Sequence, residues 1–358
     1  MIVRRLPAFG VAFLLVFSVA LSAQNDKKRD DAQKKEIQGI IKVVDDVANG
    51  QSANNDLGIA WVHEDVLKAQ GNKQYVPFTV QFDPSKVSGS TVALYWRVVA
   101  KGAAAAPVTD PKDNKKKDDN KKSNYAYEDI TFVPVQAGQN PTRVSRSFTV
   151  AAGSYDVFVV IKEPTPDKPP KNAPPSKMSV LKQAVTIPDY WNGELNTSSV
   201  ILTQRIDPLP APLTPAQQAD RPYALGMMEI VPVLETKFTK KSELSVFMLI
   251  YNPKVDANNK PDVTVEYNFC QVAAGTEPKA GEPCKAGEKF FNKTNPQNLN
   301  AQTLPPQFDM AAGHQLQSGQ AVSLAPFPEG QYRLEIKVTD KVANKSLTRD
   351  VNFSVNPS

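Results

Sequence analysis

The chain has 358 residues, with 42 Lys or Arg against 37 Asp or Glu and a formal net charge of +5, and this length suffices for two or three domains. So small a basic excess indicates mild basicity and not the footprint of a nucleic-acid-binding domain, and we expect no nucleic-acid partner. The 30 prolines, the scarcity of helix-favouring runs and the frequent apolar–polar alternation favour an all-β fold.

The N-terminus has the pattern of a secretory signal peptide. Arg4 and Arg5 precede an apolar run over residues 8–21, and small residues follow it. The run is shorter than the about 20 apolar residues of a membrane span, so we predict a signal peptide over residues 1–23 and a periplasmic or secreted chain. An uncleaved N-terminal anchor is the alternative. The rest of the sequence lacks a second such run, which predicts no transmembrane segment after cleavage.

Residues 24–54 are polar and include a predicted helix. Over residues 34–47 the apolar positions recur at helical spacing, which predicts a short amphipathic helix that packs on the first domain. These positions are Ile37, Ile40, Ile41, Val44 and Val47. A role at a membrane surface is the alternative, although the polar face mixes Asp with Lys.

An internal repeat organises the remainder of the chain. In the first half an alternating strand enters an aromatic-Asx-Pro turn at residues 82–84, the next strand carries Trp96, and a later strand begins with a Gly-x-Tyr motif that ends at Tyr155. The second half repeats this order with a turn at residues 251–253, then Tyr267, and then a Gly-x-Tyr motif that ends at Tyr332. The repeat predicts two consecutive domains of one fold.

The repeat also sets the predicted boundaries. We expect a first domain over residues 55–188, a linker over 189–197 and a second domain over 198–358. An insertion at residues 107–124 in the first domain is rich in Lys and Asp and is predicted to be disordered. A nucleic-acid patch is the alternative there, but the interleaved aspartates oppose it. The aromatic residues within 188–193 either wedge the joint between the domains or form a ligand platform.

These features resemble the immunoglobulin-like and fibronectin-type β-sandwiches. A Gly-x-Tyr motif at the penultimate strand is similar to the tyrosine corner of those folds, which the resemblance assigns to Tyr155 and Tyr332. It assigns the place of the core tryptophan to Trp96 and, in the second domain, to Tyr267. The inter-sheet disulfide of antibody domains is missing, because neither strand that would carry it has a cysteine. The resemblance implies two consecutive Ig-like antiparallel sandwiches, and it gives no function by itself.

Cys270 and Cys284 are the two cysteines of the chain. A closely spaced pair in an exported protein predicts a disulfide, and two free buried thiols are the alternative. A metal site would need further ligands, and His63 and His314 are the only histidines, so we expect no metal and no other cofactor. The bridge would pin the loop 271–283, which either belongs to a contact surface for a partner or serves stability alone.

Groups for catalysis are sparse. The sequence has no Gly-x-Ser-x-Gly motif and no His-x-x-His spacing, and each histidine is interpreted as a surface or hydrogen-bonded histidine. Residues 256–262 offer oxygen ligands for calcium but lack the closing glutamate of an EF-hand loop, and Asp and Asn also favour plain turns. Paired carboxylates that could serve glycoside hydrolysis show no sign of facing one another across a cleft. The acidic pairs are Asp45-Asp46, Glu64-Asp65 and Asp118-Asp119.

We therefore expect a non-catalytic exported protein that presents loops of two Ig-like domains to a protein or cell-envelope partner. A carbohydrate-binding accessory protein is the first alternative, which is favoured if Tyr95, Trp96 or Trp191 is exposed. A hydrolase with an unrecognised site is the second, and it requires carboxylates clustered in a pocket.

Overall fold

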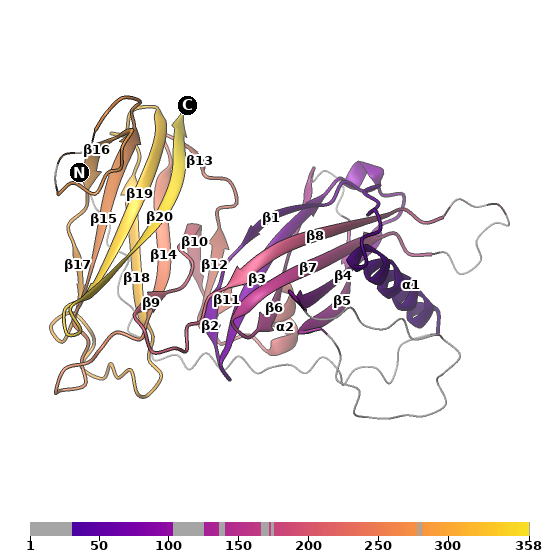
Figure 1. Ribbon diagram of the computed structural model, residues 1–358, viewed down its shortest axis with the longest axis horizontal. Helices are drawn as coiled ribbons and strands as arrows, with labels where there is room; N and C mark the ends of the chain where they lie inside the picture. The colour runs from indigo at the N-terminus through magenta and orange to yellow at the C-terminus, as the bar shows by residue number, and fades with distance from the viewer. Residues whose placement is uncertain are drawn as a thin grey trace. The chain divides into compact units, whose positions relative to one another are not determined.

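The computed structural model describes residues 31–102, 125–135, 140–165, 172, 175–277, 279 and 281–357. The predicted signal peptide (1–23) and the predicted insertion (107–124) lie outside the described residues. Strands dominate the described chain, one helix precedes them, and the sheets are antiparallel apart from a short parallel pair (Figure 1). The predicted all-β sandwich fold is confirmed. Among the described helices, none combines the length and the apolar character that crossing a membrane requires.

The chain divides into two compact units. The first, here called the first sandwich, contains residues 31–64 and 73–189 of the described chain. The second sandwich contains residues 190–357 together with Asp65–Asn72. This short segment therefore groups with the C-terminal half of the chain, although its neighbours in the sequence belong to the first sandwich.

The first sandwich consists of two antiparallel sheets. In one, β3 pairs with β1, with β6 and with the short strand β2 (Leu67–Ala69), and in the other the order is β5-β4-β7-β8. The elements are α1 (Asp31–Ala48), β1 (Ala60–Glu64), β3 (Lys73–Phe82), the 3-10 helix η3 (Pro84–Lys86), β4 (Thr91–Ala100), β5 (Tyr127–Pro134), β6 (Thr142–Val150), β7 (Gly153–Lys162) and β8 (Met178–Ile187). Alternation along β3 turns Val76, Phe78 and Val80 inward, and all three are fully buried.

Helix α1 covers the outer face of the sheet that contains β4 and β7 (Figure 1). Ile40 and Val44 are four residues apart and therefore share one face of the helix. Both are fully buried in a cluster with Tyr95 of β4 and Phe158 of β7. The helix begins at Asp31 and ends at Ala48, so it is slightly longer than the predicted 34–47.

The second sandwich has the same plan with added strands. One sheet has the order β11-β12-β10-β14-β18 with β9 on β14, and the other has the order β13-β20-β19-β15-β16 with β17 on β15. The strands are β9 (Asn196–Thr197), β10 (Ile201–Pro208), β11 (Ala224–Leu225), β12 (Met228–Pro232), β13 (Lys237–Thr239), β14 (Glu243–Tyr251), β15 (Val263–Val272), β16 (Glu288–Lys293), β17 (Gln297–Leu299), β18 (Leu316–Ser323), β19 (Gly330–Asp340) and β20 (Lys345–Asn356). A short helix, α2 (Pro215–Asp220), has a capping box at Thr214.

Each sandwich has one aromatic side chain that joins its two sheets. The indole N–H of Trp96 on β4 donates to the carbonyl of Ser147 on β6 at 3.2 Å. The hydroxyl of Tyr267 on β15 lies 2.7 Å from the hydroxyl of Ser318 on β18. The two aromatic residues occupy matching strands and are both buried, so each polar tip finds a partner on the opposite sheet.

A hydrogen-bonded tyrosine lies at the start of β7 and of β19. The hydroxyl of Tyr155 donates to the carbonyl of Ala151 at 3.0 Å, and that of Tyr332 donates to the carbonyl of Pro328 at 2.7 Å. The glycine two residues before each tyrosine has a positive φ, 151° in the first sandwich and 148° in the second, which a side chain would strain. Both rings are buried, so each tyrosine fills the core while its hydroxyl fixes the preceding connection.

We predict that this hydrogen bond contributes measurably to stability. Tyr332→Phe keeps the ring and removes the bond, so it should lower the free energy of unfolding by about 1 kcal/mol. Tyr332→Ala also empties a buried aromatic site and should lower it by about 3–5 kcal/mol. Denaturant unfolding of the full chain measures both, with Tyr155→Phe as the matched variant in the first sandwich. An unchanged midpoint for Tyr332→Ala would show that this turn does not hold the sandwich together.

Candidate functional site

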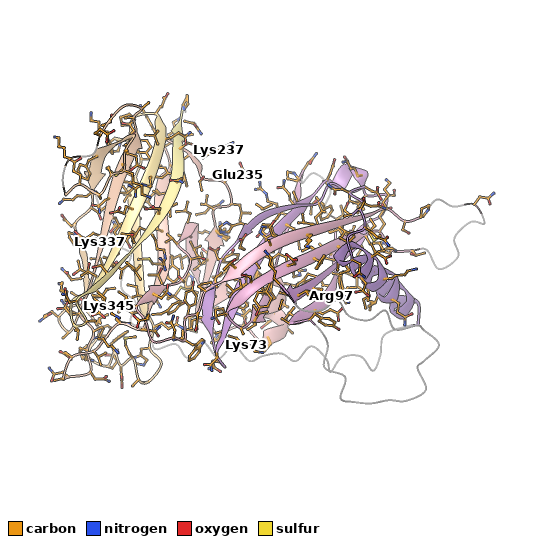
Figure 2. The ribbon with its side chains drawn as sticks, in the orientation of Figure 1. Lys73, Arg97, Glu235, Lys237, Lys337 and Lys345 are labelled. Atoms are coloured by element: carbon orange, nitrogen blue, oxygen red, sulfur yellow. A yellow bond between two sulfur atoms is a disulfide. The ribbon has the colours of Figure 1, made fainter. Side chains whose placement is uncertain are left out.

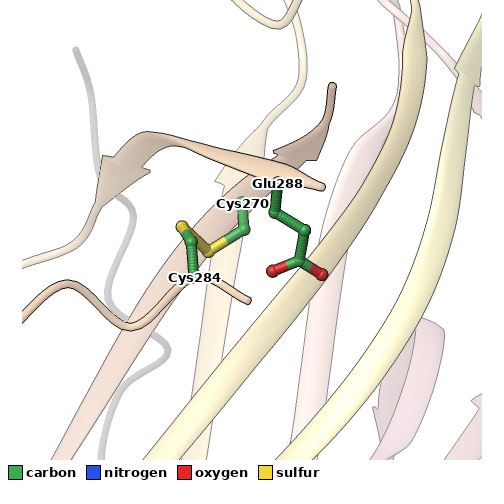
Figure 3. Close-up of side chains that lie close together, drawn as sticks. All are labelled: Cys270, Cys284 and Glu288. Carbon is green, nitrogen blue, oxygen red and sulfur yellow. A yellow bond between two sulfur atoms is a disulfide. The ribbon is translucent and has the colours of Figure 1, made fainter. Parts of the chain in front are cut away.

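The two cysteines form the predicted disulfide at one end of the second sandwich. Cys270 ends up on the outer face of its sheet because Tyr267 and Phe269 of β15 alternate into the core. It is bonded to Cys284, 14 residues later, with 5.6 Å between the Cα atoms, and the bridge lies close to Glu288 of β16 (Figure 3). A cross-link of this span stabilises a fold by about 3 kcal/mol in the chain-entropy model.

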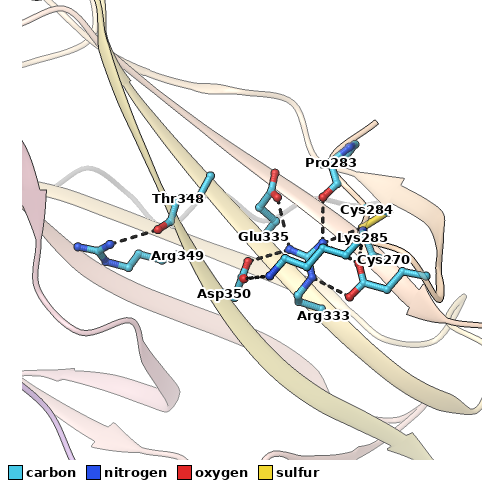
Figure 4. Close-up of polar contacts among 10 residues, drawn as sticks. Cys270, Pro283, Cys284, Lys285, Arg333, Glu335, Thr348, Arg349 and Asp350 are labelled. Atoms are coloured by element: carbon cyan, nitrogen blue, oxygen red, sulfur yellow. Dashed lines mark hydrogen bonds and ion pairs between the residues drawn. A yellow bond between two sulfur atoms is a disulfide. The ribbon is translucent and has the colours of Figure 1, made fainter. Parts of the chain in front are cut away.

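Arg333 of β19 lies on the same outer face, beneath the loop that the bridge closes. Its side chain is only 4% exposed. The guanidinium donates to both carboxylate oxygens of Glu288 at 2.7 and 2.8 Å. It also donates to Asp350 of β20 at 2.7 Å and to the carbonyl of Pro283 at 2.9 Å (Figure 4). The two bonds to Glu288 form a fork, the strongest geometry between Arg and a carboxylate.

Further contacts join this ionic cluster to the disulfide. One guanidinium nitrogen of Arg333 lies 3.8 Å from the Sγ of Cys270, and Lys285 pairs with Asp350 at 2.5 Å. Glu335 of β19 adds a carboxylate 3.4 Å from the guanidinium. An ion withdrawn from water is strongly unfavourable unless it is paired. The buried guanidinium therefore requires the loop, β16 and β20 to stay in place together.

Backbone hydrogen bonds order the loop itself. The N–H of Ala273 donates to the carbonyl of Gly287, and the N–H of Gly287 donates to the carbonyl of Thr276, both at 2.8 Å. These bonds prolong the β15–β16 hairpin beyond its paired strands. Val272 at the base of the loop is 54% exposed. The ends of the loop are thus held by covalent, ionic and backbone bonds, and Val272 beside it places an apolar side chain in contact with solvent.

The cluster is ionised at neutral pH. Hydrogen bonds from Arg333 lower the pKa of Glu288 below its usual value of 4.5. Burial raises the pKa of Asp350, but hydrogen bonds from Lys285 and Arg333 outweigh burial and lower it below 3.8. Hydrogen bonding to Glu288 raises the pKa of Arg333 above the usual value of arginine, which is itself high. Opposite charges therefore face each other over the outer surface of the sheet.

The same corner holds a group of potential metal ligands. Among the described residues, Cys270, Cys284 and Glu288 bring their ligand atoms within 4.8 Å of one another. The two sulfurs are bonded to each other, and both oxygens of Glu288 accept hydrogen bonds from Arg333. Cysteine binds a metal as a thiolate, and a carboxylate binds it through an available lone pair. These atoms fit a structural cross-link better than a metal site.

A second buried arginine fixes α1 on the first sandwich. Arg97 of β4 (Figure 2) is 7% exposed. It pairs with Asp45 of α1 at 2.6 Å and with Glu128 of β5 at 2.9 Å. Tyr95 also donates its hydroxyl to Glu128, and the ring of Tyr125 lies 4.6 Å from the guanidinium carbon. Like Arg333, Arg97 is on the outer face of its sheet and is buried by an element that covers it.

The aromatic residues considered for a ligand platform differ in exposure. Tyr95, beneath α1, and Trp96, between the two sheets, are 1% and 2% exposed and are buried on opposite faces of the same strand. Trp191 is 40% exposed, and the ammonium of Lys68 lies 4.2 Å from the centre of its ring. The ammonium of Lys68 therefore stacks on Trp191. Of the three aromatic residues, Trp191 is the one that is accessible to solvent.

The remaining sequence candidates have bonding partners of their own. Nδ1 of His314 accepts from the N–H of Asp309 at 2.9 Å, and His63 is half-buried on β1. Oδ1 of Asp256 accepts from two backbone N–H groups at 2.9 Å each, so the proposed calcium segment is closed as a turn by its own carboxylate.

The acidic pairs likewise bind neighbouring groups. Asp45 pairs with Arg97, and the indole N–H of Trp61 donates to Glu64 at 2.5 Å. Asp65 is buried and accepts from the hydroxyl of Tyr223 at 2.8 Å. The pair Asp118-Asp119 lies outside the described residues.

Sequence reasoning missed both buried arginines. Each occupies an outward position of an alternating strand, where a charged side chain ordinarily faces water. The partners of Arg333 are 45 and 17 residues away, and those of Arg97 are 52 and 31 residues away. Spacing along the chain therefore could not connect them. The available signal was only that both arginines follow a core aromatic residue directly.

Comparison with known proteins identifies no family. No family model matches the sequence, and no curated protein matches it. Among solved structures, the chain is similar to the native conformation of the alpha-2-macroglobulin of E. coli, with 11% sequence identity and a TM-score of 0.20. The match covers 86% of this chain and 16% of that chain, so this chain spans a small part of the length of that protein. We draw no inference from so weak a likeness.

We predict that Arg333 stabilises the second sandwich far more than an exposed arginine can. Arg333→Gln leaves Glu288 and Asp350 without their partner, and breaking a buried ion pair in this way costs about 3–5 kcal/mol. Arg205 pairs with Asp207 at 2.8 Å but is 63% exposed, so Arg205→Gln should cost less than about 0.5 kcal/mol. Denaturant unfolding compares the two variants. Equal losses of unfolding free energy would contradict a stabilising role for the buried ion pairs of Arg333.

We also predict a loss of stability in acid. Because the pKa values of Glu288 and Asp350 are lowered in the folded chain, their ionised forms stabilise the fold at pH values above their usual pKa values of 4.5 and 3.8. This contribution disappears as the pH falls through the lowered pKa values. The free energy of unfolding of the parent should therefore fall steeply below about pH 4. In Arg333→Gln the decline should be shallower. Parallel pH profiles for the two proteins would overturn the assignment.

Proposed function

We propose that the chain is a non-catalytic exported protein that binds a protein or cell-envelope partner through loops of two Ig-like sandwiches. The observation that carries the proposal is the double restraint on the ends of the loop 271–283, which the Cys270–Cys284 disulfide closes and whose Pro283 carbonyl accepts from the buried Arg333. Ordering a loop before binding reduces the conformational entropy lost in the complex. Loops held by a rigid framework are also where sandwiches usually bind.

Export is proposed on two grounds. Residues 1–23 have the sequence pattern of a signal peptide. The Cys270–Cys284 disulfide is of the kind that persists in the oxidising conditions of the periplasm and the extracellular space. A loop whose order depends on a disulfide suits a protein that works in such a compartment.

A binding role is further supported by how the charged groups are used. Arg97 and Arg333 each bind two or more carboxylates within a buried cluster, and both clusters attach a covering element to a sheet. Groups that hold the framework in this way are not poised to exchange protons with a substrate.

A carbohydrate-binding role is the second candidate, and Trp191 is the observation that favours it. Its ring is 40% exposed, and exposed aromatic rings can stack on the apolar faces of sugars. Tyr95 and Trp96 do not support this role because they are buried. A glycan array with the parent chain and Trp191→Ala distinguishes the candidates, since glycan binding that disappears in the variant would favour this one.

We predict that the disulfide-bounded loop contributes to partner binding. Residues 273–282 are replaced by a Gly/Ser segment of equal length, which keeps both cysteines and also keeps Pro283, whose carbonyl binds Arg333. Residues 341–344 are replaced in the same way as a control. Because Gln271 pairs with Tyr332 and Val263 pairs with Asp340, the control loop lies at the opposite end of the same sheet.

Partner recovery from envelope extract after cross-linking is compared among the parent and the two variants, each with its melting point verified. We expect at least a roughly tenfold loss of recovery for the 273–282 variant, corresponding to about 1.4 kcal/mol of binding free energy. The control variant should retain the parent's recovery. Undiminished recovery of every partner by the 273–282 variant would reduce the loop to a structural role.

A further inference from the structure

The bridged cysteines and Glu288 form a compact group of three potential ligands. Cys270 lies on β15, Cys284 closes the loop and Glu288 begins β16, and their ligand atoms lie within 4.8 Å of one another (Figure 3). In the oxidised chain the two sulfurs are bonded to each other, and the group is a structural cross-link. A disulfide is made from two thiols, so the chain also has a reduced state in which both sulfurs are free to bind something else.

The three ligand atoms have nearly the spacing of a zinc site. Zn²⁺ binds thiolate sulfur at about 2.3 Å and carboxylate oxygen at about 2.0–2.2 Å, with tetrahedral angles between its ligands. These bond lengths separate the ligand atoms by about 3.5–3.8 Å. The group already lies within 4.8 Å, so rotation of the reduced cysteine side chains brings it to that spacing. Three ligands from the protein leave the fourth position of the tetrahedron for water.

Glu288 keeps a free lone pair although Arg333 holds it. Its Oε2 accepts from Arg333 at 2.7 Å and from the backbone N–H of Lys285 at 2.8 Å, whereas its Oε1 accepts from Arg333 alone at 2.8 Å. Because each carboxylate oxygen has about two lone pairs, Oε1 retains one for a metal. The side chain is only 12% exposed. Hydrogen bonds that orient a ligand in this way before the metal arrives strengthen metal binding.

The surrounding charges favour a cation once the bridge is open. Three carboxylates face two cations in the cluster, so its net charge is −1 before the cysteines are counted; these groups are Glu288, Glu335 and Asp350 against Arg333 and Lys285. Two thiolates would add two negative charges, and a bound divalent cation would offset both. Charges in a place with little access to water are strongly unfavourable without such compensation.

We propose that Cys270, Cys284 and Glu288 bind Zn²⁺ when the bridge is reduced, so that a metal closes the loop 271–283 in one redox state and the disulfide closes it in the other. A dithiol reductant opens the bridge by exchange: two electrons pass to the bridge, two cysteine thiols form and the reductant becomes a disulfide. Zn²⁺ then displaces the two thiol protons and forms two bonds to sulfur and one to Oε1 of Glu288.

Cobalt(II) is the probe for this site, because it occupies zinc sites and its bonds to thiolates absorb strongly in the near ultraviolet. The full chain is reduced with a dithiol, freed of the reductant in the absence of oxygen and titrated with Co²⁺. We expect the thiolate absorption to saturate at one Co²⁺ per chain. Added Zn²⁺ should abolish it, because zinc binds such ligands more tightly than cobalt. The oxidised parent should show no such absorption.

Three variants, reduced in the same way, assign the ligands. Cys284→Ser leaves a single thiolate and should weaken Co²⁺ binding at least about a hundredfold, and Glu288→Gln should weaken it at least about tenfold. Asp350→Asn is the matched control, because it removes a partner of Arg333 without removing a ligand, and it should bind Co²⁺ nearly as tightly as the parent. The reduced parent also lacks the bridge, so the loss of the disulfide does not enter the comparison.

Zinc should also raise the melting point of the reduced parent, because a ligand that binds the folded chain stabilises it. The melting point of reduced Cys284→Ser should not change. Reduced parent without thiolate absorption, or with absorption but an unchanged melting point, would overturn the proposal. Equal affinities of Glu288→Gln and Asp350→Asn for Co²⁺ would also overturn it, because Glu288 would then not be a ligand.

Discussion

A guanidinium group that leaves water must find partners for its charge and for its donors, and this constraint shapes the outer face of one sheet in each sandwich. Arg97 is buried under α1 and paired with Asp45 and Glu128. Arg333 is buried under the disulfide-bounded loop and paired with carboxylates from two other strands. Neither arginine could stay buried if its covering element detached, because an unpaired buried charge is strongly destabilising. The buried arginine therefore helps to hold α1 on the first sandwich and the disulfide-bounded loop on the second.

In the second sandwich this constraint bears on the binding role that we propose. The disulfide limits the loop through the covalent chain, whereas Arg333 limits it through Glu288 and the carbonyl of Pro283. The two restraints act on neighbouring atoms but by independent physical means, so the loop retains part of its order when one is removed. A surface ordered in this way before its partner arrives loses less entropy in the complex. Oxidising conditions maintain the covalent restraint, and neutral pH maintains the ionic one.

Alternation along the strands predicted the all-β fold, helical spacing predicted the helix that covers the first sandwich, and the closely spaced cysteine pair predicted the disulfide. Inward residues such as Val76 and Phe78 share a period of two that identifies the buried face. The same period could not show that Arg97 and Arg333 are buried. It indicates on which face of the sheet a side chain lies, but not which other element covers that face. It also could not place Asp65–Asn72, whose partners Ser199 and Tyr251 are 133 and 183 residues away. Such pairings depend on tertiary contacts that no local pattern records.

Hydrogen exchange at the loop amides tests the double restraint most directly. The N–H groups of Ala273 and Gly287 are hydrogen-bonded at the base of the loop, so they should exchange slowly in the oxidised parent. Arg333→Gln with the disulfide intact should speed their exchange markedly, while amides of the first sandwich such as that of Val157 remain unchanged. Equal protection of Ala273 and Gly287 in the parent and in Arg333→Gln would contradict the double restraint, because the disulfide alone would then account for the order of the loop.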